Sequence, residues 1–133
     1  MASRFIMGGD VPVTNFDWGS AGMRCSKDNT GCQTFVVLDV VLAPGACHDF
    51  HKHPDQDEMI IVKQGSITQH IEGESCTLNA GDSVYLDKDV VHGSFNDGTE
   101  DAHLQVVLAP AMGEGGYELV DVSGDEPWAS LRG

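Results

Sequence analysis

The apolar residues of this chain fall into short runs, and turn-forming residues separate the runs at intervals of about eight to twelve residues. The longest runs cover residues 33–43, 58–62 and 104–108, and they are rich in β-branched side chains, which favour extended strands. Turn signals with Gly, Asn and Asp lie at residues 79–82 and 96–98. This pattern predicts an all-β domain, built as an antiparallel sandwich or barrel.

The longest runs carry apolar residues in both phases of the strand repeat, not only at every second position. Because successive strand side chains point to opposite faces, such strands are expected to be covered on both sides. The interior of the domain covers one side. A second copy of the chain would cover the other, so we predict a homodimer. An N-terminal flap is the alternative cover.

Composition divides the chain into three parts. Residues 1–32 are rich in Gly, Ser, Asn and Asp, and they are predicted to form a flap or an edge segment. Residues 33–110 hold the strand pattern and are predicted to form the barrel. Residues 111–133 return to Gly, Glu and Ser, and they are predicted to form a polar extension that packs on the barrel.

The 133-residue chain is long enough for one domain with a buried core. Its 7 basic and 21 acidic residues give a formal net charge of −14, which argues against nucleic acids and anionic membrane surfaces as partners. No apolar stretch reaches membrane-spanning length, and no secretion signal is recognisable. The four cysteines lack CxxC or zinc-finger spacing. Free thiols and a cytoplasmic location are therefore expected, with a Cys25–Cys32 pairing left open.

Two histidines at alternate positions mark the middle of the chain. His51 and His53 would share one face of an extended strand, and Glu58 can return to the same point on the next strand. His92 can reach it from a later hairpin. Three imidazoles and a carboxylate suit a divalent transition metal with open positions for water or substrate. We predict that these four residues hold one metal ion per chain; Fe, Mn, Ni, Co, Cu and Zn all fit the donor set.

These residues lie in two motifs that resemble those of the cupin superfamily. The first motif reads Gly45-x5-His51-x-His53-x4-Glu58-x6-Gly65. The second has the spacing Gly81-x5-Asp87-x-Asp89-x2-His92-x3-Asn96. The fifteen residues between Gly65 and Gly81 are similar to the short inter-motif segment of small bacterial cupins. The family usually carries Pro and Gly at the positions of Asp87 and Asp89, so a differently shaped turn is expected there.

The resemblance implies a single double-stranded barrel of the jelly-roll type. It also implies a small-molecule enzyme of dioxygenase, isomerase or lyase type, whose substrate binds at the metal. Some cupins use Gln near the carboxylate position, so Gln56 is an alternative ligand to Glu58. The alternative function is a non-catalytic module that binds a sugar or small metabolite through the metal. The residues do not identify a catalytic acid or base.

Strand parity makes further predictions around the first motif. Cys47 and Asp49 share the parity of His51 and are expected to point inward, whereas His48 is expected to point outward. His70, on a predicted hairpin, is expected to be exposed.

Other polar residues bear on the cavity and on the charge of its ligand. His103 or Gln105 is expected to reach the cavity as a general base or as a partner of a metal ligand. Arg24 is the one plausible cation at the mouth. A neutral or metal-chelating substrate is therefore favoured over one that needs a strong anion clamp.

Overall fold

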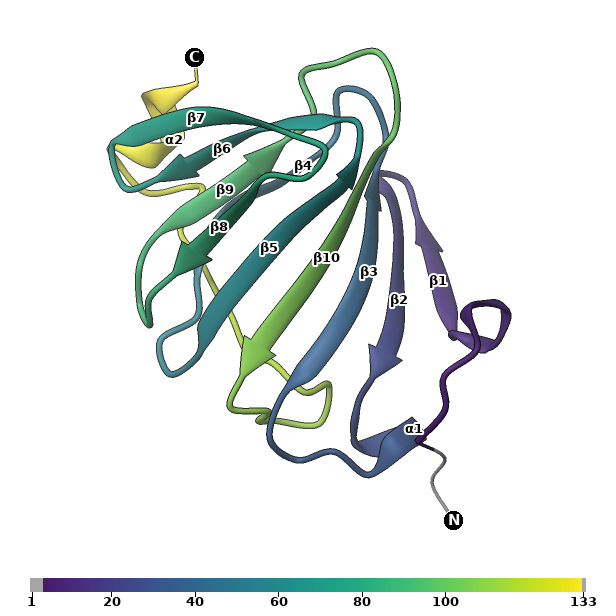
Figure 1. Cartoon of the computed structure of the whole chain (residues 1–133). Helices are drawn as coiled ribbons and strands as arrows, with labels where there is room; N and C mark the ends of the chain where they lie inside the picture. The colour runs from purple at the N-terminus through teal and green to yellow at the C-terminus, as the bar shows by residue number, and fades with distance from the viewer. Residues whose placement is uncertain (1–3, 133) are drawn as a thin grey trace.

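Two antiparallel sheets pack face to face in the computed structural model, which describes residues 4–132 (Figure 1). The larger sheet contains, in spatial order, β1 (Val13–Phe16), β2 (Gly19–Cys25), β3 (Val36–Leu42), β10 (Ala102–Ala109), β5 (Asp57–Gln64) and β8 (Ser83–Leu86). The smaller sheet contains β11 (Val120–Asp121), β4 (Cys47–Lys52), β9 (His92–Phe95), β6 (Ser66–Ile71) and β7 (Glu74–Asn79). This is the predicted all-β jelly-roll barrel.

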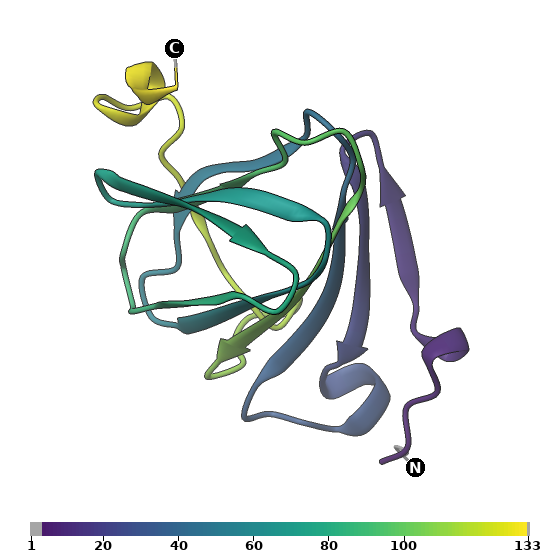
Figure 2. The ribbon, with the colours of Figure 1, turned by 45° about the horizontal axis from the view of Figure 1, so that its top comes forward.

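Helical structure in the described chain is short and peripheral. A 3₁₀ turn, η1, spans Gly8–Asp10, and the helices are α1 (Lys27–Thr30) and α2 (Trp128–Leu131). The first strand, β1, and the last helix, α2, lie at opposite ends of the molecule (Figures 1 and 2). Within residues 4–132, no helix has the length and hydrophobicity needed to traverse a bilayer.

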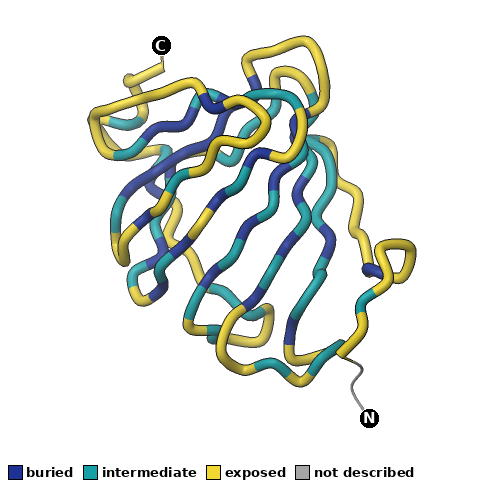
Figure 3. Tube along the Cα trace, viewed as in Figure 1, coloured by how far each residue is buried: buried dark blue, intermediate teal, exposed yellow. Residues whose placement is uncertain are grey.

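The core lies between the two sheets. Along β3 and β10 every second residue is buried and the residues between are half-buried, an alternation visible in Figure 3. Burying one Val or Leu side chain in this way stabilises the fold by about 1.5–3 kcal/mol. The inward residues of these two strands are Val36, Leu38, Val40, Leu42, Ala102, Leu104, Val106 and Leu108.

The outer face of the larger sheet carries a second row of apolar side chains. Val37 pairs with Val107, Val107 with Met59, and Met59 with Tyr85, so the row crosses β3, β10, β5 and β8. Met59 and Tyr85 are 36% and 57% exposed in the single chain. This row explains why both phases of the strands are apolar. The homodimer that would cover it stays a prediction.

The connection between β5 and β6 depends on Gly65, where the chain passes from the larger to the smaller sheet. Gly65 has φ +76°, and a Cβ atom there would lie 2.6 Å from the carbonyl oxygen of Asp101. We expect Gly65→Ala to lower the free energy of unfolding by about 2 kcal/mol or more, because a left-handed backbone and a backbone clash both oppose the methyl group. Urea denaturation measures the change.

Gly73, in the turn between β6 and β7, is the matched control. A Cβ atom at Gly73 would meet nothing within 4 Å. Gly73→Ala should therefore change stability by less than about 0.5 kcal/mol. Equal losses in the two variants would contradict the strain argument at Gly65.

Candidate metal centre

The smaller sheet and β5 bring the four predicted ligands together. His51 on β4 pairs directly with His92, the first residue of β9. His53 follows the end of β4, and Glu58 is the second residue of β5. The candidate ligand atoms of all four side chains lie within 4.8 Å of one another. His92 Nε2 is 2.8 Å from Glu58 Oε1, and His53 Nε2 is 3.3 Å from the same oxygen.

Backbone carbonyl groups fix the orientation of the three imidazoles. Their Nδ1 atoms contact the carbonyl oxygens of Asp49 (2.6 Å, from His51), Glu118 (2.8 Å, from His53) and Val90 (3.2 Å, from His92). Since a carbonyl oxygen only accepts hydrogen bonds, Nδ1 carries the proton and Nε2 presents a lone pair. This is the arrangement in which a histidine binds a metal through Nε2.

The inward atoms of this group have no partners of their own. Among the described residues, none makes a hydrogen bond with His53 Nε2, His92 Nε2 or Glu58 Oε1, although all three atoms are buried. When His53 and His92 are neutral, two lone pairs face a carboxylate oxygen, an arrangement that costs free energy unless a positive charge lies between them. A divalent cation at their common point would satisfy all three atoms, so the donor set fits a metal ion.

The ionisation of the group agrees with this fit. Burial, with a smaller contribution from nearby His92, lowers the pKa of His51 to about 4, so this imidazole is neutral at pH 7. Burial also acts to raise the pKa of Glu58, but protons on His53 and His92 outweigh it and hold the pKa below its ordinary value, and a metal cation in their place would act in the same direction. Glu58 is therefore an ionised carboxylate, and against the effect of burial it raises the pKa of His53, so metal binding there would displace a proton, whereas His51 is already a neutral ligand.

Asp89 preserves the turn that precedes His92. Its backbone adopts φ +65°, the left-handed conformation that glycine adopts readily and Asp tolerates. Its backbone N–H donates to the carbonyl oxygen of His53 at 2.9 Å, and its carboxylate lies 3.2 Å from Lys52 Nζ. Asp89 therefore adopts the backbone conformation that a glycine would favour at this position, and the turn holds the backbone of the candidate ligand His53.

A cavity of about 400 Å³ opens onto the four residues. Its polar lining includes His48, Asp49, Tyr117 and Asp121, and among the described residues that line it there is no Lys or Arg. Its aliphatic walls come from the inward faces of β3, β5 and β10: Leu38, Val40, Ile60, Leu104, Val106 and Leu108.

The prediction for His48 is wrong because β4 contains a bulge. His48 pairs with Ser94, and His51 pairs with His92, so Asp49 and Phe50 together oppose one residue of β9. The extra residue places His48 on the same face as His51, where it lines the cavity.

The bulge also explains the surroundings of Cys47 and Trp18. Cys47 lies at the cavity edge and packs against the apolar cluster of Phe50 and Phe95, where burial raises the pKa of its thiol. The indole of Trp18, in the turn between β1 and β2, meets the His48 ring edge-on with centroids 4.6 Å apart. The N-terminal strands therefore contribute to the cavity wall.

Three further predictions place polar residues on the wrong face. Gln105 donates to Asp39 at 3.0 Å on the outer face of the larger sheet, and His103 has the same parity, because β10 turns its even-numbered residues inward. Arg24 also binds Asp39, through two nitrogens at 2.6–3.0 Å, and not the cavity mouth. Pairing with Asp39, which is distant in the sequence, accounts for the positions of Gln105 and Arg24.

The prediction that His70 is exposed is also wrong. Its side chain is 8% exposed, with its ring 5.3 Å from that of Phe50 and 5.4 Å from that of Phe95, centroid to centroid. Arg132, just after α2, contacts His70 Nε2 at 3.1 Å and stacks over Phe95. The C-terminal segment thus covers the outer face of the hairpin.

Gln56 uses its amide to hold residues 110–121, here called the strap. Its Nε2 donates to the carbonyl oxygens of Pro110 (2.7 Å) and Gly116 (3.2 Å), and its Oε1 accepts from the N–H of Glu118 (3.0 Å). Glu118 in turn accepts from His53 Nδ1. With both ends engaged in this way, Gln56 lies outside the candidate ligand group, which contains Glu58.

The strap supplies the residues that sequence reasoning missed. Tyr117, Leu119 and Asp121 line the cavity, and the Tyr117 ring lies 6.3 Å from that of His53, centroid to centroid. Its Gly-rich composition over residues 113–116 indicates only a flexible polar segment. The sequence signal for the strap is Gln56, an uncharged amide between two acidic residues, because a buried amide needs hydrogen-bond partners.

Residues 38–108, more than half of the chain, match the family model of the cupin domain. This chain is a cupin. The resemblance carried by the two motifs is thereby confirmed. Protein SchB of Streptomyces halstedii is 25% identical to this cupin over 108 residues, which are 81% of this chain and 78% of SchB.

Solved structures agree on the fold. KdgF from Halomonas sp. superposes with a TM-score of 0.73 at 19% identity, covering 82% of this chain and 96% of KdgF. A predicted oxalate decarboxylase from Thermotoga maritima superposes with a TM-score of 0.71 at 19% identity, covering 80% of this chain and 99% of the other. Similarity at this level establishes the architecture and leaves the substrate to the residues of the cavity.

Proposed function

We propose that this cupin is a metal-dependent enzyme that acts on a small, uncharged, oxygen-rich metabolite, in a reaction of dioxygenase, isomerase or lyase type. The observation that supports it best is the set of buried, unpartnered atoms of His53, His92 and Glu58, which face one point beside His51. One divalent transition metal ion per chain would be held there. When bound, such an ion polarises an oxygen atom of the substrate and supplies open coordination positions.

The charge of the cavity supports an uncharged substrate. Asp49 and Asp121 line it, and the described lining includes no Lys or Arg. A dianion such as oxalate would meet these carboxylates without a cationic partner at the wall. We therefore propose that this cupin does not act on oxalate, the substrate named for the similar structure from Thermotoga maritima. Vicinal diols, hydroxyketones and neutral sugars can offer two oxygen donors without a full negative charge.

The cavity walls and His48 supply the rest of the proposed mechanism. Aliphatic side chains exclude water from the substrate and strengthen hydrogen bonds to it. Burial lowers the pKa of His48, so its imidazole is neutral at pH 7 and can accept a proton from a substrate hydroxyl group. The edge-on contact with Trp18 holds the ring in place.

Metal analysis together with product detection tests the proposal. Untagged protein should carry about one divalent ion per chain, and the loaded protein should convert a member of a panel of neutral diols, hydroxyketones and sugars. The His48→Asn variant should keep the ion and lower kcat by about 100-fold, because it removes the proton acceptor. Elemental analysis and mass spectrometry of products measure the two effects.

The same panel distinguishes the alternative function. Thermal-shift binding of a sugar or metabolite without any product, for each of the six metals, would support a non-catalytic binding module. Turnover by protein that contains no metal would contradict the metal-dependent scheme itself. An unchanged kcat in His48→Asn would remove His48 from the mechanism while leaving the metal site in place.

A further inference from the structure

Two cysteines meet at the turn that carries α1, away from the metal centre. Cys25 ends β2, and Cys32 follows Gly31, which closes α1 in a left-handed conformation with φ +79°. The Cys25 thiol is among the groups that lower the pKa of Cys32, which indicates that the two sulfurs lie within interaction range. The two residues therefore lie side by side although six residues separate them in the chain.

Hydrogen bonds within the turn hold this arrangement. The Asn29 side chain accepts from the Ser26 N–H at 2.8 Å and donates to the Arg24 carbonyl oxygen at 2.7 Å. Thr30 Oγ1 donates to the Ser26 carbonyl oxygen at 2.9 Å and accepts from the Cys32 N–H at 3.2 Å. The same hydroxyl lies 3.3 Å from Cys25 Sγ. One hydroxyl group of the turn thus contacts both the Cys25 sulfur and the Cys32 backbone, which brings the two cysteines to one place.

The environment of Cys32 favours the thiolate. The backbone N–H groups of Phe35 and Thr34 donate to its sulfur, and together with the Cys25 thiol they hold the pKa of Cys32 below its ordinary value. A thiolate is the nucleophilic form of cysteine. Cys32 is the member of the pair that is equipped to react first.

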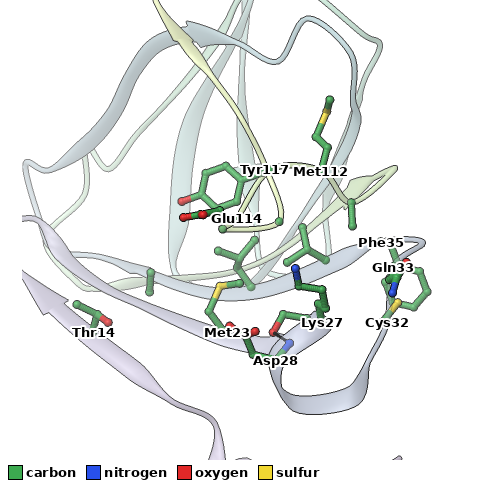
Figure 4. A pocket seen from close by; sticks show the side chains of 18 of the residues that line it. Thr14, Met23, Lys27, Asp28, Cys32, Gln33, Phe35, Met112, Glu114 and Tyr117 are labelled. Carbon is green, nitrogen blue, oxygen red and sulfur yellow. Dashed lines mark hydrogen bonds between the residues drawn. The ribbon is translucent and has the colours of Figure 1, made fainter. Parts of the chain in front are cut away.

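Cys32 is also accessible. It lines a cavity of about 760 Å³ between the α1 turn and residues 111–117, where Figure 4 shows its sulfur beside Gln33 and Phe35. The other two cysteines differ. Burial raises the pKa of Cys47, and Cys76 is exposed on β7. Cys32 combines a lowered pKa, access to a cavity and a nearby second cysteine.

We propose that Cys25 and Cys32 form a redox-active dithiol that a hydroperoxide oxidises to a disulfide across the α1 turn. The Cys32 thiolate attacks the terminal peroxide oxygen and breaks the O–O bond, which gives a sulfenic acid and releases water or an alcohol after protonation. The Cys25 sulfur then attacks the sulfenic sulfur, and the oxygen leaves as water. Two thiols are oxidised and one hydroperoxide is reduced, with no other reactant.

Peroxide titration followed by peptide mapping tests the proposal. Reduced full-length protein is treated with hydrogen peroxide, quenched with N-ethylmaleimide and digested with trypsin and chymotrypsin. Lys27 lies between the two cysteines, and Phe35 separates Cys32 from Cys47, so the linked peptides identify the bond. We expect a Cys25–Cys32 disulfide to form at least about ten times faster than Cys76 is modified.

Matched variants separate the roles of the two thiols. Cys25→Ser should leave a sulfenic acid at Cys32 that dimedone traps, and Cys32→Ser should keep Cys25 reduced at the same peroxide dose. Cys76→Ser should react as the wild type does. If Cys25 and Cys32 are modified no faster than Cys76, or if Cys32 is oxidised without bonding to Cys25, the proposal is wrong. Mapping of the wild-type chain decides this even if a variant fails to fold.

Discussion

His53→Ala is expected to lose the bound metal while the barrel stays folded. His53 contributes one of three Nε2 lone pairs, and its loss leaves Glu58 and two imidazoles to hold the ion. Mutating a residue that merely orients a ligand lowers metal affinity by 10–100-fold. Removing a ligand should therefore lower affinity by more than about 100-fold. Elemental analysis and titration of the metal-free protein with a single metal measure the loss, and circular dichroism checks the fold.

His103→Ala provides the matched histidine control. His103 is half-buried on the outer face of the larger sheet, and it pairs with Val41 across the strands, away from the candidate ligands. This variant should bind metal as the wild type does. Wild-type affinity in His53→Ala would exclude this centre as the binding site. Equal loss in both variants would indicate a general effect on the fold.

The candidate ligands could be predicted from spacing because the geometry behind the spacing is local. His51 and His53 lie two positions apart, so an extended chain turns both imidazoles to one side. Four residues then return the chain to Glu58, and the pairing of β4 with β9 sets His92 opposite His51. The first two steps span one strand or one turn, whereas the pairing of β4 with β9 joins distant segments, and the spacing of the second motif predicted His92. Hydrophobic pattern and turn residues determine structure of that size.

The face assigned to His48 could not be predicted, because a bulge shifts parity by one residue without a clear sequence signal. A similar ambiguity misplaced His103 and Gln105. Both phases of β10 are apolar or half-buried, so the pattern alone does not say which phase faces inward. The register against β3 and β5 decides it, and that register depends on contacts far apart in the chain.

Contacts between distant segments account for the remaining differences. Arg24 binds Asp39 on β3 and not the cavity mouth, and Arg132 near the end of the chain covers His70. The sequence predicts a polar extension for the strap, but in the structure the strap forms part of the cavity wall. Its position depends on Gln56, more than fifty residues earlier.

Gln56→Leu is expected to destabilise the protein and loosen the strap. Gln56 is 1% exposed, and its amide satisfies the carbonyl groups of Pro110 and Gly116 and the N–H of Glu118. Leu fills a similar volume but leaves these three backbone groups without their partner. We expect the free energy of unfolding of the metal-free protein to fall by about 3 kcal/mol, as measured by urea denaturation.

The same substitution should also weaken metal binding, because Glu118 connects the strap to His53. Its carbonyl oxygen accepts from His53 Nδ1 at 2.8 Å, so a mobile strap orients the imidazole less well and should lower metal affinity by about 10-fold. Gln105→Leu is the control, because its amide makes a hydrogen bond with Asp39 on the half-buried outer face. It should cost less than about 1 kcal/mol and leave metal affinity unchanged. If Gln56→Leu lost stability but bound metal as tightly as the wild type, the strap would be a structural element without influence on the ligands.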